Sequence, residues 1–190
     1  MKKNLILLVM LVVGISFSGC SRKDIPIPKS SIDKDKDGII HLYTGRNDNL
    51  FYEDLDDDRV ERIQRSYRRN EDVLRRALIE ASEYTIKEGK THFAIVNDGT
   101  NHLIGFPINT FQNLKDYCFK FDREQNTIKV GCSFMLVGNS VTHLKIVLLE
   151  NTPDYKSNAI EAKRMLAELS AFPANRKIED VLKEYKIEKK

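Results

Sequence analysis

The stretch that decides the fold is residues 58–96, DRVERIQRSYRRNEDVLRRALIEASEYTIKEGKTHFAIV. Apolar side chains recur through its first part at spacings of three, four and seven residues, which places them on one face of a helix. They are Val60, Ile63, Tyr67, Leu74, Ala77, Ala81 and Tyr84. The pattern predicts one long helix that stops at Gly89, where a residue free to take a positive φ closes the last turn. The apolar run His92–Asn97 then predicts a short buried strand.

Arginines cover the opposite face of the predicted helix. They are Arg59, Arg62, Arg65, Arg68, Arg69, Arg75 and Arg76, interleaved with Glu61, Glu71 and Asp72. We interpret this face as solvated and laced with salt bridges rather than as a nucleic-acid-binding helix. The acidic run Glu53–Asp58 lies directly before the helix. Its carboxylates complement the positive end of the helix dipole, which we favour over a metal site.

The rest of the chain predicts shorter elements. Residues 103–106 read as a short strand, and Asn109-Thr110 as the cap of a brief helix through Tyr117. Strands at 127–137 and 142–150, joined by Gly138-Asn139-Ser140, are expected to pair as an antiparallel hairpin. Two further helices are predicted at 158–170 and 178–185. This order, without βαβ repetition, predicts an α+β fold in which a small antiparallel sheet has helices packed on one face.

Residues 1–20, MKKNLILLVMLVVGISFSGC, have the form of an export signal. Lys2 and Lys3 precede an apolar segment that is too short to span a membrane as a mature helix. The end of the segment, FSGC at 17–20, resembles the lipobox of bacterial lipoproteins, in which the Cys becomes the acylated first residue. We therefore expect a lipid on Cys20, and Ser21 after it predicts the outer membrane. The alternative is an ordinary secretory signal with an incidental Cys.

We divide the chain into a lipoprotein signal peptide (1–19), a flexible tether (20–52) and an α+β periplasmic domain (53–190). The tether contains Asp33-Lys34-Asp35-Lys36-Asp37-Gly38, which resembles the start of a calcium-binding EF-hand loop. Thr44 stands where that loop needs a bidentate Glu. A charged linker is thus the favoured reading. A small calcium- or ligand-binding module using Asp33, Asp35 and Asp37 stays open as the alternative.

The cysteines and the charge fit an exported domain. Acylation of Cys20 would leave Cys118 and Cys132, which we expect to pair as a disulfide in an oxidising compartment. The competing possibility is two buried free thiols. Removing residues 1–19 takes away two lysines and no acidic residue, leaving 29 basic against 28 acidic residues, a net charge of +1. Bulk charge therefore gives no argument for a nucleic-acid partner.

No catalytic or cofactor-binding motif is visible in the sequence. GxSxG, P-loop, Rossmann and CxxC patterns are missing, and the four histidines at 41, 92, 102 and 143 lack metal-ligand spacing. We predict a protein that is not an enzyme and that has no cofactor.

The join of helix to strand, ALIEA at 77–81 followed by Thr85 and GKTHFAI at 89–95, is similar to a segment of several small envelope lipoproteins. One group is the Cag pathogenicity island lipoprotein family, which is associated with type IV secretion. The resemblance covers roughly residues 70–170. It implies a membrane-anchored lipoprotein with a structural or protein-interaction role in the cell envelope, including a place in a secretion assembly. Expected partners are the membrane, through the N-terminal lipid, and other envelope proteins.

Overall fold

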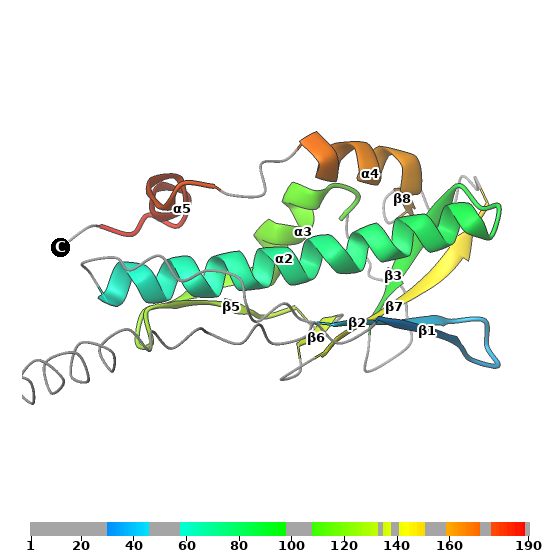
Figure 1. The fold of residues 1–190 in the computed structure, drawn as a ribbon, viewed down its shortest axis with the longest axis horizontal. Helices are drawn as coiled ribbons and strands as arrows, with labels where there is room; N and C mark the ends of the chain where they lie inside the picture. The colour runs from blue at the N-terminus through cyan, green and yellow to red at the C-terminus, as the bar shows by residue number, and fades with distance from the viewer. Residues whose placement is uncertain are drawn as a thin grey trace, which may run out of the picture.

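The computed structural model describes residues 30–45, 58–97, 108–132, 135–137, 141–150, 159–171 and 176–188. The predicted signal peptide, Cys20, the acidic run at 53–57 and the strand predicted at 103–106 lie outside this part of the chain. Helix α2 (Asp58–Lys87) runs along one face of an antiparallel sheet, and the other helices lie on the far side of α2 (Figure 1). The predicted α+β fold, with a small antiparallel sheet and helices on one face, is confirmed.

Helix α2 forms as its apolar pattern predicts. Ile63, Tyr67, Leu74 and Ala77 are fully buried along the face that meets the core. Gly89 takes a φ of 71°, and the Lys90 N–H donates to the Thr85 carbonyl at 3.0 Å, so the helix ends where predicted.

The main sheet has six strands, all in antiparallel pairs. Along the sheet the order is β1 (Ser31–Lys34), β2 (Ile40–Gly45), β7 (Val141–Leu149), β3 (His92–Val96) and β8 (Ala159–Glu161). Strand β6 (Met135–Val137) pairs with the first part of β7, beyond the end of β3. The central strand β7 thus joins segments from both ends of the chain into one core.

The prediction of a flexible tether through residue 52 is wrong for residues 31–45. They form the β1–β2 hairpin, and β2 pairs with β7 in a register that sets Leu42 opposite Leu144. In β2, buried Ile40 and Leu42 alternate with half-buried His41 and Tyr43. This is the period of a strand with one covered face. The alternation is short and follows a run of charges, which hid it in the sequence.

The predicted long hairpin is confirmed only where β6 pairs with β7. Strand β5 (Thr127–Val130) instead pairs with β4 (Phe119–Asp122) in a separate two-stranded sheet. The turn between them is held by Asp122 Oδ1, which accepts the N–H groups of Glu124 (2.9 Å) and Gln125 (3.1 Å). Asn126 completes it with a φ of 50°. Asp and Asn are typical turn residues at these positions. The turn directs residues 127–130 to β4, although residues 127–137 read as one continuous strand in the sequence.

The short helices largely follow the prediction. Helix α3 (Phe111–Cys118) is capped by Thr110, whose hydroxyl accepts the Asn113 N–H at 3.1 Å. Helix α4 (Ala162–Ala171) begins later than predicted because residues 159–161 pair with β3 as strand β8. Helix α5 (Ile178–Glu184) lies close to its predicted position. Within the described residues, no helix is long and apolar enough to cross a membrane.

Candidate functional site

A basic groove lies between helix α2 and strand β5. Its volume is about 440 Å³. Three arginines of α2 and one lysine of β5 line it, together with small polar and apolar side chains. These residues are Arg62, Arg65, Ser66, Arg69, Asn70, Thr127, Ile128, Lys129 and Val130. Four of the nine lining residues are cations and none is acidic, so the groove is a candidate site for an anion.

The two walls of the groove are locked together through Ile128. Its backbone N–H donates to Ser66 Oγ at 2.7 Å, and its carbonyl accepts the side-chain amide of Asn70 at 2.6 Å. The Ser66 hydroxyl also donates to the Ile63 carbonyl at 3.0 Å. The Ile128 side chain itself is 2% exposed and belongs to the core. Because β5 is fixed to α2 in this way, the groove is formed before any ligand arrives.

The three arginines share one side of α2 at positions i, i+3 and i+7. With a rise of 1.5 Å per residue, Arg62 and Arg69 are separated by about 10 Å along the axis. Lys129 contributes a fourth cation to the lining from β5. The groove therefore offers a row of guanidinium groups rather than one isolated cation.

Two carboxylates outside the lining partly neutralise the groove. Glu61 pairs with Arg65 one turn away, and Asp122 pairs with Lys129 across the hairpin. The hydrogen bond from Lys129 holds the pKa of Asp122 below its usual value, so this carboxylate is charged at neutral pH. The Arg65 and Lys129 side chains remain 40% and 51% exposed, and pairs this exposed are weak. A stronger anion can therefore replace the carboxylates.

A second basic pocket, of about 360 Å³, adjoins the start of α2. Arg59, Arg123 and Lys186 contribute its cations and Glu188 an anion, and Phe121 and Tyr185 contribute aromatic side chains. Arg59 Nε donates to Asn126 Oδ1 at 2.8 Å, which links α2 to the turn of the β4–β5 hairpin. Basic side chains thus flank this hairpin on both sides.

Salt bridges are present on the predicted arginine face. Arg65 pairs with Glu61, and Arg76 lies 4.0 Å from Asp72. Arg75 instead donates to the Leu169 carbonyl at 2.6 Å, so it joins α2 to α4. The groove was missed because its second wall comes from a strand whose pairing the sequence did not reveal.

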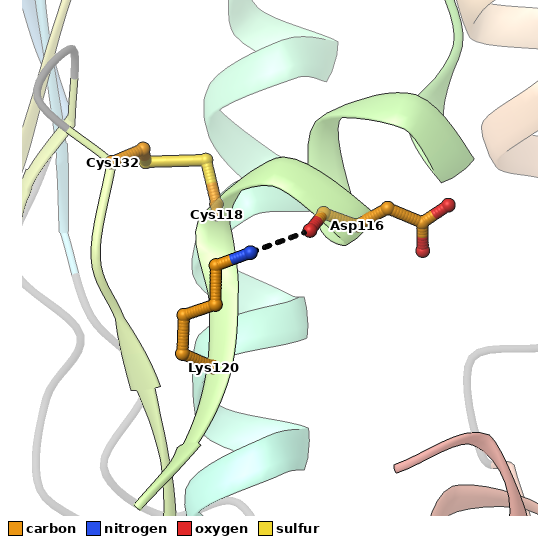
Figure 2. The surroundings of a disulfide bond; sticks show 4 residues. All are labelled: Asp116, Cys118, Lys120 and Cys132. Carbon is orange, nitrogen blue, oxygen red and sulfur yellow. Dashed lines mark hydrogen bonds between the residues drawn. A yellow bond between two sulfur atoms is a disulfide. The ribbon is translucent and has the colours of Figure 1, made fainter.

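Cys118 and Cys132 are paired as predicted. Their Cα atoms are 4.6 Å apart, within the range for a disulfide. The bond joins Cys118, at the end of α3, to Cys132, which lies two residues after β5. It lies beside the hydrogen bond from Lys120 Nζ to the Asp116 carbonyl (Figure 2). The hairpin that forms one wall of the groove is therefore closed by a covalent link.

The calcium-like sequence forms the turn of the β1–β2 hairpin. Asp35 Oδ1 accepts the N–H groups of Asp37 and Ile39, each at 2.9 Å, and Gly38 takes a φ of 81°. Asp33 lies earlier, on β1, opposite His41. Within the described ranges, no group of three or more His, Cys, Asp or Glu residues could hold a metal ion. The carboxylate of Asp35 stabilises the turn by accepting these two hydrogen bonds.

Sheet pairing also brings together histidines that are far apart in sequence. Tyr43 lies opposite His143, and their rings stack with centroids 4.6 Å apart. His41 Nδ1 is 3.1 Å from His143 Nε2, and His41 Nε2 is 3.3 Å from Asp35 Oδ2. The facing nitrogens can share one proton, which joins β2 to β7. No local spacing in the sequence predicts this contact.

A buried ionic cluster joins three helices. Lys115 of α3 is fully buried and lies 3.5 Å from Glu184 of α5, and Tyr67 of α2 donates to Glu71 at 3.2 Å. Arg176 pairs with Glu184 and donates to the Tyr67 hydroxyl at 3.2 Å. Burial raises the pKa of Glu71 and lowers the pKa of Lys115. Because the ammonium group of Lys115 is buried, we interpret this cluster as a contact that holds the helices together rather than as a ligand site.

The groove is open and cationic, which suits non-covalent binding of an anion. The disulfide fixes one of its walls, and the histidine contact lies on a different part of the sheet. The resemblance to the Cag lipoprotein family stays a prediction. Comparisons with protein-family models, with curated proteins and with solved structures find no match for this chain.

Proposed function

We propose that this chain is a lipid-anchored protein of the bacterial cell envelope whose folded domain binds an anionic envelope component in the basic groove. The anchor is the acylated Cys20, and the membrane is the outer membrane, with the domain facing the periplasm. The role is interaction rather than catalysis, within a larger envelope assembly such as a secretion system.

Two features support export. The N-terminal segment has a positive start, an apolar stretch and a small-small-Cys end. Cys118 and Cys132 lie at disulfide distance, which suits an oxidising compartment. More than one acyl chain is needed for stable anchoring, because each buried CH₂ contributes only about 0.8 kcal/mol. A lipidated N-terminal Cys would meet that need.

The observation that carries the binding role is the composition of the groove. Three arginines and one lysine line it, no lining residue is acidic, and its walls are held by hydrogen bonds at Ile128. A preformed concave site of a few hundred Å³ with convergent charged groups is typical of a binding site.

Photo-crosslinking in intact cells tests this proposal. A photoreactive amino acid replaces Thr127 in the groove, and a second protein carries it at Glu83, an exposed position on α2 outside the groove. The full chain is expressed with its own signal. We expect a groove-specific adduct in the membrane fraction that disappears when Arg62→Glu and Arg69→Glu are combined.

The matched control is Arg164→Glu, a charge reversal on the exposed face of α4. It should leave the adduct intact. The proposal fails if the mature chain is found in the soluble fraction, or if the Thr127 and Glu83 positions give the same adducts.

A further inference from the structure

The groove presents chemistry that selects among anions. Arg supplies three of its four cations. A guanidinium group is planar and donates two parallel hydrogen bonds to a pair of oxygens on phosphate or carboxylate. A single carboxylate occupies one guanidinium group, whereas Arg62, Arg65 and Arg69 extend over about 10 Å of α2. A row of lipid phosphodiesters, each with two non-bridging oxygens that match one guanidinium group, uses the whole array.

Two neutral polar groups in the groove make hydrogen bonds to the protein itself. The Asn70 amide donates to the Ile128 carbonyl, and Ser66 Oγ accepts the Ile128 N–H. The other polar residues of the lining are the four cations and Thr127, beside the apolar side chains of Ile128 and Val130. Such a site recognises charge density more than the detailed shape of a polar ligand. Each Lys or Arg near an anionic membrane surface strengthens binding by a factor of about five, so a few together are sufficient to orient a domain.

The groove also lies within reach of the expected anchor. Ser30 Oγ donates to Glu80 Oε1 at 2.5 Å, which places the start of the described chain beside α2. Along the helix, Arg69 is about 17 Å and Arg62 about 27 Å from Glu80. Cys20 precedes Ser30 by ten residues, a separation that spans at most about 35 Å. The covalent chain therefore permits the groove to meet the same membrane that holds the lipid.

We propose that the groove binds the phosphate groups of anionic lipid headgroups, and so lays the domain against the membrane that holds its anchor. This inference rests on the proposed function, since it requires a chain that is anchored at a membrane.

Lysine footprinting of the acylated full chain in vesicles tests the inference. Lys129 is half exposed and lines the groove, and Lys163 is exposed on α4, away from it. Both are labelled with an amine-reactive reagent and quantified by mass spectrometry. Three membranes are compared: phosphatidylcholine alone, phosphatidylcholine with phosphatidylglycerol, and phosphatidylcholine with oleate at the same surface charge.

We expect phosphatidylglycerol to slow the labelling of Lys129 about fivefold or more relative to Lys163. Phosphatidylcholine, whose choline cation offsets its phosphate, should give no protection. Combining Arg62→Glu with Arg69→Glu should abolish the protection, and Arg164→Glu should preserve it. Raising the salt concentration should weaken it, because the contacts are exposed to solvent.

Three outcomes would overturn the inference. Equal protection by oleate would show that the groove does not select phosphate. Equal protection by dissolved inorganic phosphate over phosphatidylcholine vesicles would assign the site to a soluble phosphate compound instead of a lipid. Unchanged Lys129 labelling in phosphatidylglycerol, with a groove-specific protein adduct still present in cells, would refute lipid binding and leave the proposed function standing. Failure of the proposed function is distinct, since it appears in cells as a mature chain in the soluble fraction or as equal adducts at the Thr127 and Glu83 positions.

Discussion

Breaking the Cys118–Cys132 disulfide should destabilise the domain by a predictable amount. The bond has a sequence separation of 14, so it closes a loop of 15 residues. On the chain-entropy model, a loop of that size contributes about 3 kcal/mol, because the cross-link restricts the unfolded chain. A domain of ordinary stability has about 5–15 kcal/mol in total, so the reduced protein should stay folded but be clearly weakened.

Urea denaturation of the oxidised and the reduced chain measures this effect. Reduction keeps both sulfur atoms in place, so it isolates the cross-link from the loss of side-chain packing. With a typical urea m-value of 1–3 kcal/mol/M, we expect the midpoint to fall by about 1–3 M. The m-value should rise slightly, because the unfolded chain without its cross-link is more expanded.

The double variant Cys118→Ala/Cys132→Ala provides the second measurement. Both side chains are buried, at 0% and 8% exposed, so truncation adds a small packing loss to the loss of the bond. Its midpoint should be at or below that of the reduced protein. A reduced protein whose midpoint lies within about 0.2 M of the oxidised one would refute the reasoning, since the loop would then contribute almost nothing.

Three further predictions concern other residues of the chain. Cys20→Ala should abolish labelling with radioactive palmitate and change signal processing, and labelling that persists would show that the lipid is elsewhere. Burial raises the pKa of Glu71, so its contribution to stability is present below the ordinary value of 4.5 and is lost as the pH rises through the raised pKa. The unfolding free energy of wild type relative to Glu71→Gln should therefore decrease from about pH 4 to pH 7, and a flat or rising difference would contradict the assignment. Isothermal titration should detect no micromolar calcium binding at the β1–β2 turn, because Thr44 lacks the carboxylate that the twelfth loop position requires.

Local patterns in the sequence predicted the elements whose signals are complete within one segment. The helix around Tyr67 shows its apolar face over many turns, and Gly89 marks its end. Thr110 supplies a cap through its own hydroxyl. In each case the interaction that defines the element joins residues close in the chain, so spacing alone is informative.

Elements defined by distant partners were not predicted. Residues 40–45 become a strand because β7, about a hundred positions later, offers a matching apolar face. Residues 127–130 turn back on β4 because Asp122 and Asn126 form the turn and Ile128 docks on α2. The groove depends on this pairing of β5 with β4. Its arginines were visible in the sequence, but the wall that converts them into a site was not.

The same hairpin connects the disulfide to the groove. Lys129, Ile128 and Val130 line the groove from β5, and Cys132 lies two residues beyond that strand. In a reducing compartment the hairpin would be held by its own hydrogen bonds, by the contacts of Ile128 with α2 and by the hydrogen bond from Arg59 to Asn126. Oxidation after the proposed export would add the covalent closure at its open end. The groove would then gain rigidity in the compartment where we propose that the anchor and the anionic ligand are found.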